Sequence, residues 1–367
     1  MKNAITLTLI LIIGIVASAN AEQTFSPFRH DIYALGMGDA FVASGENANA
    51  FLYNPALLSK IRGIKVAVDA QLYVNREFKT VVDYMYDNQD HFENWDDLSP
   101  TERDELVTGM QDFDDRWVAV GGSPALSVVL PMGVGFALYN NASMKVRLDR
   151  GIFEPKGYAD LYNDMVFAGG YSRQVMPKLS VGGNLKYISR RVSGEVKLLA
   201  SEFGKADDIF EEVEDSLESS KSGFGLDVGG LYTLTPNIDL GASIIDLIGT
   251  VDGDKTPVYF RVGGAYHYSG GFVTNSFLRE VVLACDIDDM FNQDGDHLFN
   301  KMHLGADFRM PIVSFRFGFN QGYPGLGVGF NFKFVKLDYA YVGNELGSAP
   351  GRESNYSHYA QLAFGWM

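Results

Sequence analysis

The side chains best suited to metal chemistry are five aspartates and one asparagine in a short stretch near the C-terminal third. They are Asp286, Asp288, Asp289, Asn292, Asp294 and Asp296. Carboxylate and amide oxygens are the ligands that Ca²⁺ prefers, so this stretch could hold calcium. Its order does not match the calcium-loop template, which ends in a Glu, and the alternative is an acidic loop without an ion. We expect no metal and no other cofactor.

Catalytic signatures are absent from the sequence. It contains no His-Glu-x-x-His run, no Gly-x-Ser-x-Gly elbow and no phosphate-binding glycine loop with a Lys. The six histidines are scattered, and the single cysteine, Cys285, lies on an apolar face with Val281, Leu283 and Ile287. One cysteine excludes an intramolecular disulfide, and we expect an inert buried or lipid-facing thiol. The sequence therefore indicates a protein that is not an enzyme.

Charged residues of both signs recur at positions that share one face of their predicted strands. They are Lys65, Asp69, Lys186, Asp227, Arg261, Glu280, Asp307, Arg309, Arg316, Lys333 and Asp338. If these strands form a barrel, the charges line its lumen. They then either pair with one another and anchor an internal segment, or line a polar transport path.

The strands are predicted from an apolar pattern of period two that runs from Gly63 to the end. Between residues 63 and 76, the even-numbered residues from Ile64 to Val74 are apolar, whereas Lys65, Asp69 and Gln71 lie on the other face. Fourteen such segments are predicted, at 63–76, 116–130, 134–148, 163–175, 179–193, 222–234, 238–249, 257–268, 278–288, 301–310, 312–321, 325–334, 336–345 and 356–367. Their lengths are close to the roughly 9–11 residues that a tilted strand needs to cross a bilayer.

The connections between these segments are predicted to alternate strictly between short and long. Tight turns are predicted at 131–133, 176–178, 235–237, Met310 with Pro311, and Val335 with Lys336. Long loops are predicted at 77–115, 149–162, 194–221, 289–300 and 346–355. Short turns on one side and long loops on the other are typical of outer-membrane barrels. We therefore predict an all-β fold, a transmembrane antiparallel β-barrel of about 14 strands whose C-terminus lies on the short-turn side.

The N-terminal residues predict export. Lys2, the apolar run from Ala4 to Val16 and the small residues before Glu22 have the layout of a cleavable signal peptide at residues 1–21. The formal net charge of −16 excludes nucleic acid as a partner, because nucleic-acid binding requires clustered Lys and Arg. We expect the bacterial outer membrane as the location, with its lipid bilayer as a partner.

Much of the acid lies in two predicted loops. Residues 87–115 hold eleven carboxylates, and residues 202–218 hold eight. Within the second loop, Ile209, Phe210, Val213 and Leu217 have the spacing of a short amphipathic helix. Such loops form either a solvated surface or a lid or docking surface over the pore mouth.

Residues 22–62, between the signal peptide and the barrel at 63–367, do not read as strands. A glycine-bearing run, with Gly36, Gly38 and Asp39, leads to the rigid turn of Asn54, Pro55 and Ala56. This pattern resembles the FadL-type outer-membrane superfamily, and it is most similar to the branch that holds PorV, PorQ and an uncharacterised spirochaete group. The resemblance implies a fourteen-stranded barrel with an N-terminal hatch in its lumen, to which Gly36, Gly38, Asp39 and the Asn54, Pro55, Ala56 turn would belong.

Two functions follow from these expectations. The first is passage of hydrophobic or amphipathic small molecules, with the hatch shifting to open a path. The second, implied by the PorV-like relatives, is a platform that binds exported proteins through the acidic loops 77–115 and 194–221.

Overall fold

The computed structural model describes residues 28–114, 116–151, 154–193, 196–200, 216, 219–270, 277–291, 297–346, 348–352 and 354–366. The expected signal peptide lies outside these residues. So do Ile209, Phe210, Val213 and Leu217 of the expected loop helix, and Asn292, Asp294 and Asp296 of the acidic stretch.

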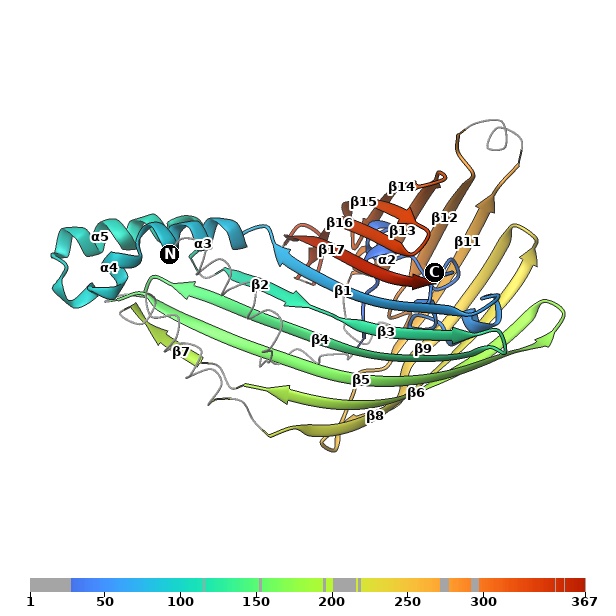
Figure 1. Ribbon diagram of the computed structural model, residues 1–367. Coiled ribbons are helices and arrows are strands. Elements are labelled where there is room, and N and C mark those ends of the chain that lie inside the picture. The colour runs from blue at the N-terminus through green and yellow to red at the C-terminus, as the bar shows by residue number, and fades with distance from the viewer. Residues whose placement is uncertain are drawn as a thin grey trace.

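The described chain forms one antiparallel sheet that closes on itself, with β1 paired to β17 (Figure 1). Its strands are β1 (Lys65–Asn75), β2 (Trp117–Gly122), β3 (Ala125–Leu130), β4 (Val134–Asp149), β5 (Lys156–Met176), β6 (Leu179–Val192), β7 (Val196–Leu199), β8 (Lys221–Thr235), β9 (Ile238–Val251), β10 (Asp254–Lys255), β11 (Tyr259–Tyr268), β12 (Glu280–Ile287), β13 (Met302–Arg309), β14 (Val313–Asn320), β15 (Tyr323–Phe332), β16 (Val335–Glu345) and β17 (Ser354–Trp366).

These strands make fourteen barrel staves. β2 and β3 both lie between β1 and β4 in one continuous register, so together they form a single stave interrupted at Ser123 and Pro124. β7 pairs with the N-terminal end of β5, and β10 folds back on β9. The predicted fold class and the count of fourteen are confirmed. Trp366 pairs with Val66, which places the end of β17 beside the short turns.

The barrel is apolar outside and polar inside, the reverse of a soluble protein. In β1, Val68 and Leu72 are 52% and 48% exposed, whereas Asp69 between them is 3% exposed. In β14, Phe315, Phe317 and Phe319 point outward around the buried Arg316. Successive residues of a strand point to opposite faces, so this alternation presents one apolar face to lipid and one polar face to the lumen.

Several expected boundaries are wrong. β5 begins at Lys156, not near residue 163, and its additional N-terminal residues pair with β4 and β7. The connection 269–279 falls on the short-turn side although it is long, and Gln321 with Gly322 makes a tight turn on the long-loop side. Both residues of that turn have positive φ, 54° and 86°, as a two-residue hairpin requires. The lengths of the connections therefore do not alternate strictly.

The first long loop is largely helical, whereas a loop without helices was predicted there. It contains α3 (Phe78–Asp87), α4 (Gln89–Glu93), η3 (Trp95–Asp97), α5 (Pro100–Gly109) and η4 (Met110–Asp112), and it projects from the barrel at the left of Figure 1. Phe92, Trp95 and Met110 form its buried core. Ser99 and Glu102 make a capping box that starts α5, with Pro100 at its first position. No helix in the described ranges is long and apolar enough to span a membrane.

Replacing an outward phenylalanine by lysine should destabilise the barrel. Phe317 lies in the middle of β14 and is 50% exposed on the outer face, where a charge near the bilayer centre costs about 2–4 kcal/mol. We expect Phe317→Lys to lower the free energy of unfolding from lipid vesicles by about that amount. Met132→Lys, at a 72% exposed site in the turn between β3 and β4, is the control. Equal unfolding free energies for the two variants would contradict the inside-out arrangement.

Candidate functional site

The described N-terminal segment, residues 28–62, lies inside the barrel (Figure 1). It contains α2 (Ile32–Gly36), η1 (Ala50–Leu52) and η2 (Pro55–Ser59). The Asp31 side chain caps α2 by accepting a hydrogen bond from the Tyr33 N–H at 2.9 Å. α2 contacts β14 to β17, whereas η2 contacts β5, β6 and β8. The segment therefore reaches from one side of the wall to the other.

Glycines let the segment press directly against the strands. A β-carbon on Gly318 would lie 2.1 Å from the Gly38 nitrogen, and one on Gly327 would lie 2.8 Å from the Gly36 Cα. Gly38 has φ of 64°. A β-carbon added to Gly38 would lie within 2.6 Å of two strand carbonyl oxygens. On the opposite wall, a β-carbon on Gly182 would meet the carbonyl carbon of Pro55 at 2.6 Å. Backbone thus packs on backbone at both sides, which leaves no room for another side chain at these contacts.

The turn of Asn54, Pro55 and Ala56 is fixed to β8 by one buried amide. The Asn54 Nδ2 donates to the Val42 carbonyl at 2.9 Å and to the Gly230 carbonyl at 3.1 Å. Its Oδ1 accepts from the Ala56 N–H at 3.0 Å, which caps η2. The rigid turn predicted at these three residues is therefore tied both to the segment and to the wall.

Asp39 joins the segment to β11. It has φ of 65°, and its carboxylate accepts from the Tyr53 hydroxyl at 2.6 Å and from Arg261 at 3.2 Å. Burial raises the pKa of Asp39, but His30 and Arg261 together outweigh burial, so its pKa is lowered and the carboxylate is charged. Arg261 also pairs with Asp288.

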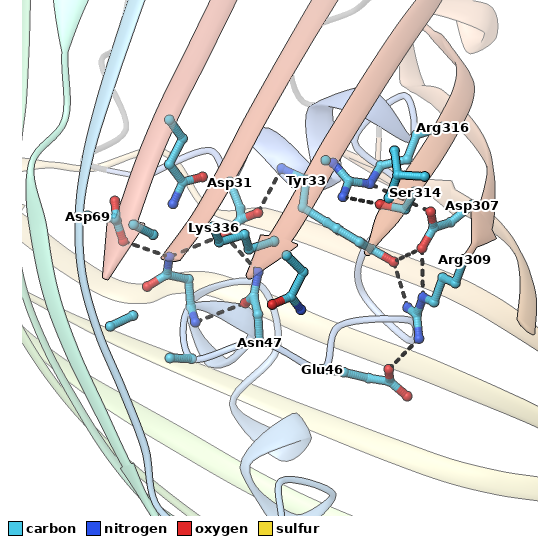
Figure 2. Close-up of a pocket in the computed structure, with 18 of the residues that line it drawn as sticks. Asp31, Tyr33, Glu46, Asn47, Asp69, Asp307, Arg309, Ser314, Arg316 and Lys336 are labelled. Atoms are coloured by element: carbon cyan, nitrogen blue, oxygen red, sulfur yellow. Dashed lines mark hydrogen bonds and ion pairs between the residues drawn. The ribbon is translucent and has the colours of Figure 1, made fainter. Parts of the chain in front are cut away.

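Tyr33 is the centre of the polar contacts on the other side (Figure 2). Its hydroxyl donates to Asp307 at 2.6 Å and accepts from Arg309 at 2.6 Å. The Arg316 guanidinium stands 4.2 Å from the ring centroid and the Lys336 ammonium 5.1 Å from it, both in cation–π range. One side chain of the segment therefore engages β13, β14 and β16.

A cavity of about 270 Å³ lies beside Tyr33, between the segment and the strand ends near the short turns. Figure 2 shows Asp69, Asp31 and Lys336 toward one side of it and Asp307, Arg309 and Arg316 toward the other. The acids already have partners: Asn47 donates to Asp31 at 3.0 Å, and Arg29 pairs with Asp69. The lining mixes these polar groups with apolar side chains such as Phe41, Met310 and Ile312.

The predicted lumen residues are placed as follows. Lys65 donates to the Glu46 carbonyl at 2.6 Å, and Lys186 pairs with Asp227 and Asp246 at 2.8 and 2.6 Å. Asp69, Arg261, Asp307, Arg309 and Arg316 also point inward, and each has a partner named above or pairs with Asp338. Lys186 belongs to a separate group on β6, β8 and β9, away from Tyr33.

The prediction that Lys333 lines the lumen is wrong. β15 ends at Phe332, so Lys333 is exposed in the tight turn with φ of 53°, not in the lumen. The turn expected at Val335 and Lys336 lies two residues earlier, and Lys336 is the lysine that reaches the cavity. Arg29, Tyr33 and Glu46 were also missed, because their partners are distant in sequence and no local pattern reveals them.

The aspartates of the acidic stretch that the structure describes bind protein groups. Asp286 accepts from the Phe41 and Val42 N–H groups at 2.5 and 2.7 Å, and Asp289 pairs with Lys301, the last residue of η6 (Leu298–Lys301). Among the described residues, no three His, Cys, Asp or Glu side chains lie close enough to hold a metal ion.

Comparison with known proteins finds similarity of structure and no match of sequence. No family model matches the chain, and no curated protein matches its sequence. Among solved structures, the toluene transporter TodX of Pseudomonas putida is 14% identical, with 94% of this chain and 99% of that chain covered and a TM-score of 0.55. A deltaS2S3 mutant of TodX, described as a monoaromatic hydrocarbon channel, is 13% identical over 93% and 100% of the two chains, with a TM-score of 0.56. The toluene transporter TbuX of Ralstonia pickettii is 12% identical over 94% and 98%, with a TM-score of 0.51. The chain therefore has the fold of these hydrocarbon channels, a closed fourteen-stranded β-barrel.

Proposed function

We propose that this protein passes hydrophobic or amphipathic small molecules across the bacterial outer membrane, with the N-terminal segment as the hatch that gates the lumen. The observation that carries the proposal is the position of that segment. It reaches from β14 to β17 on one side to β5, β6 and β8 on the other, and it is pressed against wall glycines on both. A molecule that enters the lumen must therefore pass or displace it.

The comparisons support the substrate class. Two of the similar structures are described as toluene transporters and one as a monoaromatic hydrocarbon channel, and each is covered almost completely by this chain. The substrate class that we propose is small hydrophobic molecules.

The two sides of the segment differ in a way that suits a gate. Toward β6 and β8 it is held by neutral hydrogen bonds, such as Asn54 to the Gly230 carbonyl, and by apolar packing of Phe51 and Leu58. Toward β13 to β16 the charged contacts of Tyr33 beside the cavity add to the apolar packing of Ile32 and Leu35. This side borders the cavity, into which the polar groups of Tyr33, Asp307 and Arg309 can turn to meet water, so we infer that it releases first.

The alternative, a platform for exported proteins, has no support among the comparisons. Its candidate docking surface is the helical loop 77–115, which has its own core and an acidic exterior. An acidic surface is also what any solvated loop presents, so this loop does not by itself favour a protein partner.

Native mass spectrometry of the protein extracted gently from outer membranes tests the proposal. We expect a bound hydrophobic molecule of low mass and no second polypeptide. A stoichiometric exported protein on a barrel free of small molecules would overturn the transport proposal in favour of the platform.

A further inference from the structure

We propose that the outer face of β16 and β17, at the loop end of the barrel, binds the phosphorylated headgroup of an outer-leaflet glycolipid. The patch consists of Arg76, Tyr339, Tyr341, Tyr356 and His358, with Arg352 and Tyr323 at its rim. It faces away from the lumen, and none of these residues contributes to the gate. The inference needs the barrel to stand in an outer membrane but does not depend on what the barrel transports.

Strand register places the patch on the outward face. Tyr341 pairs with His358, and Tyr356 with Gly343, in the β16–β17 ladder. Directly paired residues share a face, and Tyr339 on that face is 41% exposed while Asp338 beside it is buried in the lumen. Arg76 follows β1 next to Tyr356, whose carbonyl accepts the Arg76 N–H at 2.8 Å. The Arg76 side chain is 55% exposed.

The types of side chain on the outward face change along the barrel from the short turns to the loops. Nearer the short turns it carries Leu337, Leu362 and Phe364, all exposed and apolar. Toward the loops these give way to the tyrosines and His358, and then to Arg76 beyond the end of β1. Hydrocarbon, interfacial aromatics and then cation is the order in which a lipid presents its chains, its glycerol or sugar region and its phosphate.

The aromatic side chains form one connected surface. The Tyr341 ring stacks on Tyr356 at 5.3 Å between centroids and lies 4.7 Å from the His358 ring. The Tyr339 hydroxyl and the His358 Nδ1 are 2.7 Å apart. The Arg76 guanidinium stands 5.9 Å from the Tyr356 centroid. Flat rings with hydroxyl groups suit a sugar face, and the adjoining cation suits a phosphate.

Two arginines give the patch its charge preference. Arg76 donates to one carboxylate oxygen of Glu77, through Nε at 3.2 Å and Nη2 at 2.9 Å, and a guanidinium has five N–H donors. Arg352 is exposed and donates through Nη1 to the Ser348 hydroxyl at 3.3 Å. Its backbone and the Tyr323 hydroxyl both engage Glu345. Both guanidinium groups therefore retain donors for a phosphate, in a chain whose net charge of −16 otherwise repels anions.

Lipid retention tests the inference. The full-length barrel is placed in nanodiscs of equal parts phosphatidylcholine and lipid A, and lipid A that remains bound is counted by native mass spectrometry. We expect the Arg76→Ala, Arg352→Ala double variant to retain lipid A with about 25-fold lower affinity, since each of the two basic side chains near an anionic surface contributes a factor of about five. Arg76→Lys with Arg352→Lys should recover part of the loss. Lys79→Ala removes an exposed cation from the helical loop and should change nothing.

Two further arms identify the ligand. Dephosphorylated lipid A should be retained as poorly by the wild type as lipid A is by the double alanine variant, and millimolar inorganic phosphate should not displace lipid A. The patch would be an aromatic belt without a phosphate site if the wild type and the double variant retained lipid A equally. The same would follow if the wild type retained lipid A and dephosphorylated lipid A equally. Displacement by inorganic phosphate would show a site for a free anion, and either result overturns the proposal. A barrel that transports nothing but retains lipid A through these arginines would refute the proposed function and leave this inference standing.

Discussion

Gly318→Val should release the N-terminal segment from its wall and open the lumen. A β-carbon at residue 318 would lie 2.1 Å from the Gly38 nitrogen and 2.5 Å from the Met37 carbonyl carbon, and both are backbone atoms that cannot rotate away. Overpacking of this kind typically costs about 1–3 kcal/mol. Because the segment is easier to move than the β14 ladder, we expect that cost to appear as displacement, raising the displaced population by about 5- to 150-fold.

Limited proteolysis measures that displacement. Trypsin should cut after Arg29 and Lys60 faster in Gly318→Val than in the wild type, and small polar solutes should leak through membranes that contain the variant. Gly264→Val is the matched control, because Gly264 pairs with the outward Cys285 and its β-carbon would have no neighbour closer than 3.5 Å. If the two variants were cleaved and leaked alike, the segment would not be the barrier.

Lys186→Met should cost the barrel about 3–5 kcal/mol of stability, the usual effect of stranding buried charges. The Lys186 ammonium lies between Asp227 and Asp246, at 2.8 and 2.6 Å, and all three side chains are at most 3% exposed. Methionine matches the shape of lysine but leaves two carboxylates in the wall of the lumen without their cation. Urea unfolding of the barrel in lipid vesicles measures the loss.

A charge-neutral combination separates this effect from altered packing. Lys186→Met together with Asp227→Asn and Asp246→Asn removes all three charges and should recover much of the lost stability. Lys79→Met breaks the exposed ion pair with Asp83 and should cost less than about 1 kcal/mol. A Lys186→Met barrel as stable as the Lys79→Met barrel would show that the lumen charges do not hold the wall together.

The barrel could be predicted from the sequence because the alternation of apolar and polar residues is visible within each single strand. Alternation of Val68, Leu72 and their neighbours with Asp69 and Gln71 is visible in the chain and sets the two faces directly. Tight turns were harder to place. One turn was predicted at 335–336 but lies at 333–334, so Lys336 is in the lumen and Lys333 is outside it. The ends of a strand are harder to predict than its existence.

The contacts of the N-terminal segment could be predicted only in outline. Gly36, Gly38 and the turn at Asn54 are conspicuous locally, but their partners Gly327, Gly318 and Gly230 lie far along the chain. Tyr33 meets Asp307 across 274 residues, and no spacing rule connects them. The helices of residues 78–112 did carry a local signal, the Ser99, Pro100 and Glu102 start of α5, that could have been recognised.

The central claim, that the N-terminal segment gates a path for hydrophobic molecules, is tested most directly by uptake of radiolabelled toluene into whole cells with an intact outer membrane. Cells that express the wild-type chain should take up toluene faster than cells without it. Cells that express a chain lacking Asn54, Pro55 and Ala56 should show an altered rate while the purified barrel keeps its resistance to unfolding. Uptake by wild-type cells no faster than by cells without the protein would contradict the account.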